Sequence, residues 1–515
     1  MANLIVCCDG TWNTADDREA GVPSPTNVVK IFNAIEKTEN GGLTQRAYYH
    51  PGVGTEGGRF EKFMGGATGN GLEKNNKSAY KWLAQNYHAG DNIYIFGFSR
   101  GAYTARYVAG IICSYGLTDF STKTPSDDEM WQQVDRVFEA CRSEATPQSL
   151  SDLTFFHTPL GESPRNRMTI HFLGVWDTVG SLGIPNDMAL LNLLDGIGSH
   201  EFRNTQLSNS VSHARHAVAI DERRQSFTPT LWDNVDSHPD AKQIWFAGVH
   251  SDVGGGYLQT GLSDIALKWM MDEAGAQGLV YRRGIETQIG PDPRGTLHDS
   301  HVGVFSALKT LPRSVPLVSN GVTNTGALHD SVIERWSNPP IEQSPYWEGK
   351  VLPVGGSTAV DVFARQHWNA TGIYLERDAE YSFEATGQWM DGDITCDASG
   401  TQSEASIIGQ FAQMAGAALG KAEKLYQDLT GNAEADFWWS KRIEEYEWFA
   451  LVGVIANGMG TNVHGGPAEH EVFKIGNKLT YRPRENGYLY CFANDAWQAY
   501  RNNRGSVRLV VKRVR

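Results

Sequence analysis

The chain has 515 residues, more than one hydrophobic core usually spans, so its length predicts two domains. A hydrophobic fraction of 40% and a charged fraction of 20% are typical of a globular protein. The formal net charge of −14 argues against nucleic acid as a partner. No apolar run approaches the roughly 18 residues of a transmembrane segment, and the amino terminus lacks the basic flank and cleavage site of a signal peptide. We therefore expect a chain that is made and folded in the cytoplasm.

Short apolar runs alternate with helical patterns in the first half of the chain. Strand-like runs cover residues 4–8, 46–49, 93–96, 169–176 and 243–249, and helical patterns cover residues 26–36, 72–86, 102–109 and 130–144. This alternation predicts an α/β fold, with a doubly wound and mostly parallel sheet that carries helices on both faces. The functional side chains of such a sheet gather where the strands end, at their carboxyl edge.

A Gly-x-Ser-x-Gly turn at residues 97–101 joins the third strand-like run to a helical pattern. Glycine on both sides of the serine permits a strained backbone and lets the helix pack close behind the strand. The strain lifts the serine hydroxyl out of the sheet edge, beside the positive end of the helix. We interpret Ser99 as a nucleophile. The alternative is a packing turn in which the serine only caps the helix.

A serine nucleophile needs an imidazole base, and the imidazole needs a carboxylate that orients it. We select His250 as the base because it ends the fifth strand-like run and precedes a run of glycines. The rival histidines, His213 and His216, lie in residues 208–221, which have a helical pattern. Asp177 follows the fourth run and is the preferred acid, since the chain order Ser, Asp, His is that of an α/β-hydrolase.

Two other carboxylates stay open as the acid, Asp252 and Asp9. Asp252 lies so close in sequence to the candidate base that bracing a loop is its simpler role. Asp9 follows the first strand-like run. If that strand neighbours the serine strand, the backbone amides of Gly10 or Thr11 and of Arg100 form an oxyanion hole.

Several motifs follow one another in the first part of the chain, at residues 8–13 (CDGTWN), 49–55 (YHPGVGT), 97–102 (GFSRGA), 174–179 (GVWDTV), 219–224 (AIDERR) and 248–257 (GVHSDVGGGY). Together they resemble the α/β-hydrolase family that includes the first class of type VI secretion phospholipase effectors, and the resemblance spans residues 3–340. It implies a serine esterase, with phospholipase activity in the effector members. It also implies export into a target cell, with secretion machinery or an immunity protein as partners. His50 stands where the family pattern has an acidic residue.

From about residue 345 the pattern changes to alternating apolar and polar residues. Runs at residues 360–364, 372–375, 379–385, 451–455, 479–482, 487–494 and 506–511 predict the strands of an antiparallel β-sandwich. We therefore place a catalytic domain at residues 1–344 and a smaller sandwich domain at residues 345–515. A helical insertion is expected at about residues 403–447, as a helix that either packs on the catalytic domain or covers the active site at a lipid surface. The sequence does not decide whether Cys396 and Cys491 form a disulfide.

Two stretches of this second domain, residues 381–392 and 493–505, resemble the calcium-dependent galactose-binding lectins of the PA-I type. The resemblance implies calcium bound by oxygen ligands, and a carbohydrate as a partner. The residues that match the ligand positions by sequence are Asp495, Asn502, Asn503, Ala499 and Asp391. Ala499 replaces the threonine of the lectins, so its backbone carbonyl is the group that can serve there. The alternative interpretation is a polar hairpin that binds no metal.

The sequence as a whole indicates a serine-dependent carboxylic-ester hydrolase, a lipase or phospholipase that needs no cofactor for catalysis. One alternative is an esterase that acts on an acylated polysaccharide to which the lectin-like domain directs it. The other alternative is a non-catalytic surface-binding protein whose hydrolase core serves as a scaffold.

Overall fold

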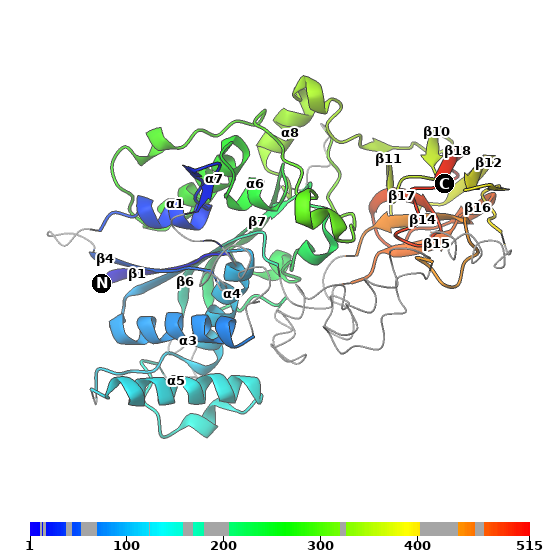
Figure 1. Ribbon diagram of the computed structural model, residues 1–515. Helices are drawn as coiled ribbons and strands as arrows, with labels where there is room; N and C mark the ends of the chain where they lie inside the picture. Colours follow the sequence, from blue (N-terminus) through cyan, green and yellow to red (C-terminus); the bar gives the residue numbers. More distant parts are fainter. Residues whose placement is uncertain are drawn as a thin grey trace. The chain divides into compact units, whose positions relative to one another are not determined.

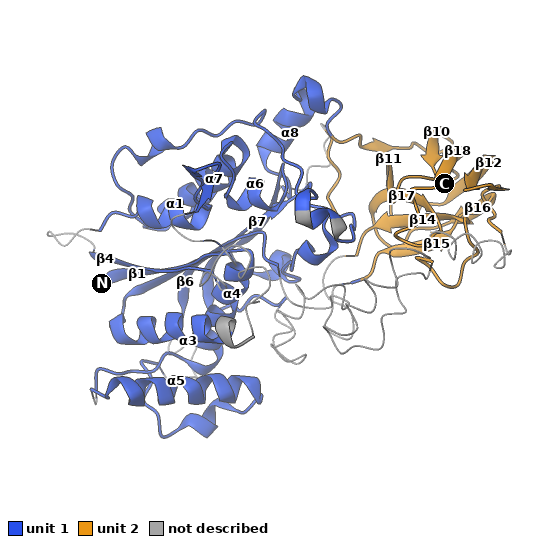
Figure 2. Cartoon of the chain, in the orientation of Figure 1, with its two compact units in different colours: residues 1–313, 320–346, 459–468 blue, residues 314–319, 347–458, 469–515 orange. Residues whose placement is uncertain are grey.

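The computed structural model describes residues 1–10, 13, 17–37, 44–52, 69–122, 124–157, 168–179, 205–319, 326–401, 441–458 and 468–515; of residues 69–72, 304 and 307 it describes the backbone. The chain forms two compact units (Figure 2). Unit 1 comprises residues 1–313, 320–346 and 459–468, and unit 2 comprises residues 314–319, 347–458 and 469–515. The chain therefore enters unit 2 briefly after Arg313, returns to unit 1, and passes to unit 2 again after Tyr346.

Unit 1 is built around a six-stranded sheet whose strands are all parallel, in the order β4-β1-β5-β6-β7-β8. The strands are β1 (Ala2–Cys8), β4 (Thr44–His50), β5 (Asn92–Phe98), β6 (Ile170–Trp176), β7 (Val211–Ala219) and β8 (Ala241–Phe246). The α/β architecture predicted from the sequence is confirmed. Most of β1, β5 and β6 is buried, as continuous apolar runs require in a sheet that is covered on both faces.

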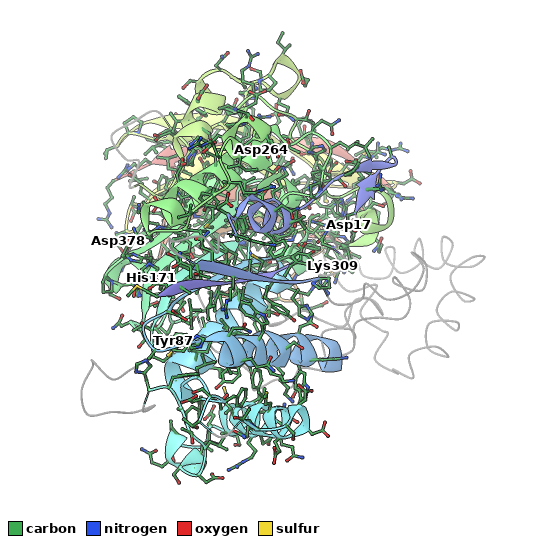
Figure 3. All side chains as sticks on the ribbon, turned by 90° about the vertical axis from the view of Figure 1, so that its left-hand side faces the viewer. Asp17, Tyr87, His171, Asp264, Lys309 and Asp378 are labelled. Carbon is green, nitrogen blue, oxygen red and sulfur yellow. The ribbon has the colours of Figure 1, made fainter. Side chains whose placement is uncertain are left out.

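Helices cover both faces of this sheet (Figure 1). The helices of unit 1 in the described residues are α1 (Asn27–Ala34), α3 (Gly69–Asn86), α4 (Arg100–Tyr115), α5 (Asp127–Arg142), α6 (His250–Gly254), α7 (Gly261–Ala276) and α8 (Asp330–Ser337). Helices α1 and α7 lie on one face and α3, α4 and α5 on the other. Figure 3 shows the same layering from the side, with Asp264 of α7 above the sheet and Tyr87, which follows α3, below it.

The helix predicted at residues 208–221 is wrong, because this segment forms the buried strand β7. Polar side chains interrupt the apolar run that would otherwise have indicated a strand in the sequence. Arg215 pairs with Asp240 and Glu273, and the His213 imidazole is bonded to Asp240 as well. Partners supplied by other segments thus allow charged residues to lie in a covered strand, and a pattern read along one segment does not reveal them.

The strand order reverses direction between β1 and β5, which are direct neighbours. Open α/β sheets bind ligands at such a switch point, outside the carboxyl ends of the strands. Two glycines make the close packing there possible. A Cβ on Gly97 would lie 2.4 Å from the Gly101 carbonyl oxygen, and a Cβ on Gly101 would lie 2.3 Å from the Cys8 carbonyl oxygen. Glycine is therefore required on both sides of the turn between β5 and α4.

Unit 2 contains two five-stranded sheets. One has the order β10-β18-β12-β13 with β16 paired to β12, and the other has the order β15-β14-β17-β11-β9. The strands are β9 (Lys350–Val351), β10 (Ser357–Phe363), β11 (Asn369–Leu375), β12 (Tyr381–Asp391), β13 (Ile394–Cys396), β14 (Leu451–Ala456), β15 (Glu471–Lys474), β16 (Lys478–Tyr481), β17 (Gly487–Ala493) and β18 (Asn503–Arg513). All pairs are antiparallel except β9 with β11. Side chains of both sheets form one hydrophobic core, which includes Trp389 and Leu489.

Three sequence expectations concern segments outside these sheets or pairs within them. Of the helical insertion expected at about residues 403–447, residues up to 440 lie outside the described residues, and residues 441–447 form a β-bridge, bends and a turn rather than a helix. Cys396 and Cys491 are both free thiols rather than a disulfide. Within the part of the chain that the structure describes, none of the helices is long and apolar enough to cross a membrane.

The close approach of α4 to β1 generates a test. Helix propensity alone would make Gly101→Ala stabilising by about 1 kcal/mol. The added Cβ would instead meet backbone oxygens of Cys8 and Asp9 at 2.3 and 2.4 Å, which cannot move aside. We therefore expect Gly101→Ala to destabilise the protein by about 1–3 kcal/mol, seen as a lower melting temperature.

The matched control is Gly290→Ala, where an added Cβ meets no described atom within 4 Å. Its melting temperature should stay close to that of the native protein. A Gly101→Ala protein that melts at or above the native temperature would contradict the packing at this turn.

Candidate active site

Ser99 stands between β5 and α4 in a strained conformation. Its backbone has φ 58° and ψ −125°, a region that residues other than glycine seldom adopt. The Ser99 amide donates to the Trp176 carbonyl oxygen at 3.1 Å, which ties the turn to the end of β6. Ser99 is the N-cap residue of α4, so its hydroxyl lies at the positive end of a 16-residue helix.

Asp177 follows β6 and is fully buried. Phe98 and Trp176 are paired across β5 and β6, so Ser99 and Asp177 directly follow partners on neighbouring strands. The Asp177 carboxylate accepts hydrogen bonds from the His250 ring nitrogen Nδ1 at 2.6 Å and from the Ala219 amide at 2.9 Å.

Arg313 binds the same carboxylate through both of its terminal nitrogens, Nη1 to Oδ1 at 2.7 Å and Nη2 to Oδ2 at 3.0 Å. Burial by itself would raise the pKa of the Asp177 carboxyl. The charge of Arg313 and the hydrogen bonds from His250 and Arg313 outweigh burial and hold this pKa well below its ordinary value. Asp177 is thus a permanent acceptor for the imidazole near neutral pH.

His250 begins α6, and its ring is enclosed by aromatic side chains. The ring centroid lies 4.6 Å from that of Phe98, the residue before Ser99, and 5.0 Å from that of Phe227. This burial lowers the pKa of His250 in spite of the hydrogen bond with Asp177. A neutral imidazole that donates from Nδ1 keeps its other nitrogen, Nε2, as a proton acceptor.

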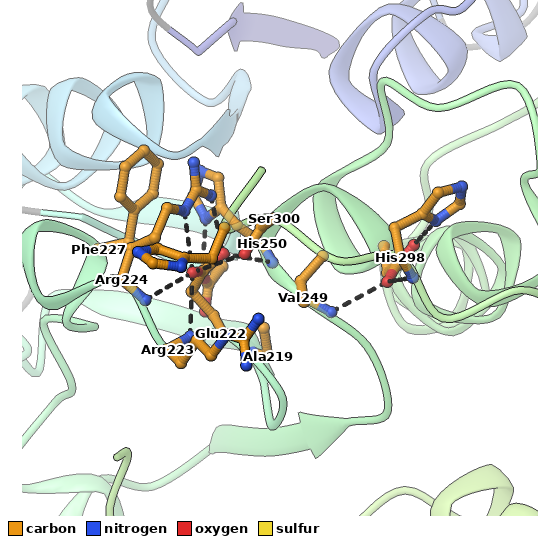
Figure 4. A network of polar contacts seen from close by, with 12 residues as sticks. Ala219, Glu222, Arg223, Arg224, Phe227, Val249, His250, His298 and Ser300 are labelled. Carbon is orange, nitrogen blue, oxygen red and sulfur yellow. Dashed lines mark hydrogen bonds and ion pairs between the residues drawn. The ribbon is translucent and has the colours of Figure 1, made fainter. Parts of the chain in front are cut away.

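Glu222 connects the backbone of His250 to a buried arginine (Figure 4). The carboxylate accepts from the His250 amide at 3.3 Å, from Arg224 Nη2 at 2.7 Å and from the Ser300 hydroxyl at 2.9 Å. Burial acts against ionisation, but the hydrogen bond and charge of Arg224 lower the pKa of Glu222 to about 2. The Arg224 guanidinium in turn stacks on Phe227, with Cζ 3.5 Å from the ring centroid. The network therefore holds in place both His250 and Phe227, whose ring packs against it.

The two alternative acids have other partners. Asp252 Oδ1 lies 2.5 Å from the ring nitrogen Nδ1 of His298, and Asp252 Oδ2 accepts from the Val249 amide at 3.1 Å, at the start of α6. Asp9 accepts from the hydroxyls of Thr26 and Tyr49. Burial raises the pKa of Asp9 to about 6 despite these bonds. Asp177 is the one of the three candidate carboxylates that the structure brings to the ring of His250.

The two other candidate histidines, His213 and His216, lie in β7 and bond to residues other than Asp177. His213 Nδ1 lies 2.5 Å from Asp240 Oδ2. His216 Nδ1 lies 3.0 Å from Gln243 Oε1, and its Nε2 accepts from the Thr178 amide at 3.2 Å. Burial, followed by the charge of Arg106, lowers the pKa of His216 to about 3, so this imidazole is neutral.

The candidate oxyanion donors, the amides of Gly10 and Arg100, follow the carboxyl ends of β1 and β5. A Cβ built on Gly10 would lie 3.3 Å from Ser99 Cβ, so the Gly10 backbone passes close to the serine. The Gly10 amide itself donates to Asp9 Oδ1 at 2.8 Å. Thr11 lies outside the described residues. Arg100 provides the first amide of α4, next to Ser99.

The sequence did not indicate a role for two residues of the site, Arg313 and Glu222. Glu222 belongs to the AIDERR motif at residues 219–224, so a signal existed without a role attached to it. Arg313 lies 136 residues from Asp177 in sequence, in the segment between the 3-10 helix Gly303–Ala307 and α8, and its neighbours form no motif.

The lectin-like loop of unit 2 gathers two carboxylates and two amides. Asn503 Nδ2 donates to Asp495 Oδ2 at 2.8 Å, and Asn502 Nδ2 donates to Asp391 Oδ1 at 2.5 Å. The side-chain oxygens of both asparagines are buried and have no hydrogen-bond partner among the described residues. Burial raises the pKa of Asp495 to about 7, and the negative charge of Asp391 adds to the rise. The Ala499 carbonyl accepts from the Asn502 amide at 3.4 Å.

Part of the chain is similar to known proteins in sequence. A family model described as “T6SS, Phospholipase effector Tle1-like, catalytic domain” matches residues 2–273. Among curated proteins, the “Uncharacterized protein YEL023C” of Saccharomyces cerevisiae is 31% identical over 245 residues, which cover 44% of this chain and 32% of that relative. The chain thus spans about a third of the length of the curated relative.

Solved structures show weaker likeness. The structure of the Tle1 effector bound to the VgrG spike from the Type 6 secretion system has a TM-score of 0.29 and 18% identity, over 50% of this chain and 52% of that chain. The N-terminal domain of EclA, a PllA-like lectin, has a TM-score of 0.17 and 17% identity, over 30% of this chain and 94% of that chain.

Proposed function

The chain belongs to the family of type VI secretion phospholipase effectors with a Tle1-like catalytic domain, and on this premise we propose that it is a serine-dependent carboxylic-ester hydrolase that cleaves acyl esters of phospholipids. The observation that carries the proposal is the 2.6 Å contact between His250 Nδ1 and Asp177, at the end of the strand beside the one that presents Ser99. The strained turn at Ser99 supports the same assignment, because strain concentrates at functional sites.

The proposed reaction runs through an acyl-enzyme. Ser99 Oγ attacks the acyl carbonyl carbon while His250 Nε2 takes the hydroxyl proton, and Asp177 holds the imidazole in the Nδ1–H tautomer. The tetrahedral intermediate collapses as the C–O bond to the leaving alcohol breaks and His250 returns the proton to that oxygen. Water, activated by the same imidazole, then attacks the acyl carbon and releases the fatty acid and Ser99.

The oxyanion hole is also part of this proposal. The Arg100 amide is the first of α4, where helix amides lack partners within the helix and the dipole favours negative charge. The second donor is an amide of the loop after β1, at Gly10 or Thr11. Since the Gly10 amide donates to Asp9, its use requires that this bond be exchanged for one to the oxyanion.

Family membership also supports export from the producing cell into a target cell by a type VI secretion system. Secretion machinery or an immunity protein is the partner that we propose for this route. An esterase for acylated polysaccharides remains the alternative activity, and a non-catalytic scaffold the alternative role. A hydrolysis screen over phospholipid vesicles, short acyl esters and acetylated glycans separates them. Turnover of phospholipids above the other two classes supports the proposal, and turnover of glycan esters alone would replace it.

The nucleophile is tested by Ser99→Ala. We expect a loss of esterase turnover on the order of 10⁴–10⁶-fold with little change in melting temperature, because the residues of a triad act as a unit and the hydroxyl adds little packing. An alkyl fluorophosphonate should label the native protein and leave Ser99→Ala unlabelled. The matched control is Ser78→Ala on α3, whose exposed hydroxyl donates to the Lys74 carbonyl. Equal labelling of the native protein and Ser99→Ala would exclude Ser99.

The identity of the acid is tested by replacing each of two aspartates with asparagine. Asp177→Asn should lower kcat by about 10⁴-fold, because an amide favours the wrong imidazole tautomer. Asp252→Asn should lower it far less, since Asp252 contacts His298 and the start of α6 rather than the ring of His250. The reverse order of the two effects would move the acid to Asp252.

For unit 2 we propose a calcium site at Asp391, Asp495, Asn502 and Asn503. Oxygen ligands suit this ion, and the side-chain oxygens of both asparagines are buried with no hydrogen-bond partner among the described residues, so they are available as ligands. When bound, calcium would balance two carboxylates that now repel each other in a buried setting. The Ala499 carbonyl supplies a further oxygen, and hydroxyls of a sugar could complete the shell.

Calcium should raise the melting temperature of the full chain, because it binds the folded state. Asp495→Asn should abolish the rise, while Asp361→Asn, an exposed carboxylate paired with Arg508, should preserve it. Since burial raises the pKa of Asp495 to about 7, protons should compete with calcium below that pH and the stabilisation should shrink as pH falls through it. A further rise with galactosides would support a carbohydrate partner. If calcium does not change the melting temperature at pH 8, the loop is a hairpin that binds no metal.

A further inference from the structure

Arg313 makes more contacts at the active site than its pairing with Asp177 alone. Its Nη1 also donates to the Ala219 carbonyl and its Nη2 to the Phe227 carbonyl, both at 2.6 Å. The side chain is 3% exposed and that of Asp177 is 0% exposed. One guanidinium therefore fixes the acid, the end of β7 and the residue whose ring packs against His250. Planar two-point binding of a carboxylate is a geometry that arginine provides and lysine does not.

This pairing changes the electrostatics of the base. A triad acid without a counter-ion attracts the imidazolium with its full negative charge and favours the protonated ring. Here the negative charge of Asp177 is already balanced by Arg313, so a proton on His250 gains less from the acid and is repelled by the guanidinium. In a site from which water is excluded, this difference is larger than it would be at the surface.

Other polar and charged groups lie on the elements packed around His250. Glu222 and Arg224, on the segment after β7, are paired with each other at 2.7 Å. Asp252, on α6, is hydrogen-bonded to the His298 ring and to the Val249 amide. His216, within β7, is neutral because burial lowers its pKa. Arg313 is the cation bound to the Asp177 carboxylate itself, so its loss would leave that negative charge unbalanced beside the imidazole.

We propose that Arg313 is a positioning residue that turns the Asp177 carboxylate toward His250 and balances its charge, so that His250 stays an unprotonated base in mildly acidic solution. This inference rests on the proposed serine-hydrolase function. It predicts an enzyme whose kcat/KM persists to lower pH than that of a triad with an unpaired acid.

The test is the pH profile of kcat/KM on a soluble short-chain ester. Arg313→Gln and Arg313→Met remove the charge, and either should move the acid limb up by about one pH unit or more. Arg313→Lys keeps the charge but loses the two-point contact, so its limb should stay close to the native one while kcat falls. The matched control is Arg215→Gln, which removes another buried, doubly paired arginine and should leave the limb in place.

A rate that falls equally at all pH values in Arg313→Gln and Arg313→Met, with no movement of the limb, would reduce Arg313 to a structural role. The native protein provides a second measurement that needs no variant. The rate of fluorophosphonate labelling of Ser99 should reach half its plateau below the ordinary histidine pKa of about 6.5. Half-maximal labelling at or above that pH would overturn the inference but not the function. Absence of labelling at every pH would instead overturn the proposed function.

Discussion

The candidate active site of unit 1 depends on one carboxylate that is buried away from water. Asp177 is fully buried, and a buried charge is tolerated when paired and hydrogen-bonded. Three segments supply its donors: the Ala219 amide at the end of β7, the ring of His250 on α6, and both terminal nitrogens of Arg313. Because each segment would lose a bond to a buried charge if it moved, the carboxylate fixes the arrangement of all of them.

Packing against glycines positions the turn that carries Ser99 relative to His250. A Cβ on Gly254 would lie 1.9 Å from Phe98 Cε2, so α6 sits directly on the phenylalanine that precedes Ser99. The same ring lies against His250. Gly101 lets α4 approach the end of β1, which brings the candidate oxyanion loop beside the turn. Close backbone contact at the switch point of the sheet therefore assembles groups from distant parts of the chain, and hydrogen bonds then orient them.

The sequence predicted those features that leave a local pattern. The apolar runs of β1, β5 and β6, the glycines around Ser99, and the polar residues at strand ends each follow from a few consecutive residues. The fold class, the turn and the juxtaposition of Asp177 with His250 could therefore be anticipated. Strand β7 was missed because Arg215 is neutralised by Asp240 and Glu273 from other segments. Arg313 was missed because its role arises from a partner 136 residues away.

The most direct test is a crystal structure of the protein after reaction with an alkyl phosphonate. The account predicts phosphorus bonded to Ser99 Oγ, His250 Nε2 hydrogen-bonded to the adduct, and His250 Nδ1 still donating to an Asp177 carboxylate held by Arg313. An adduct on another side chain, or a His250 ring that bonds Asp252 in place of Asp177, would contradict it.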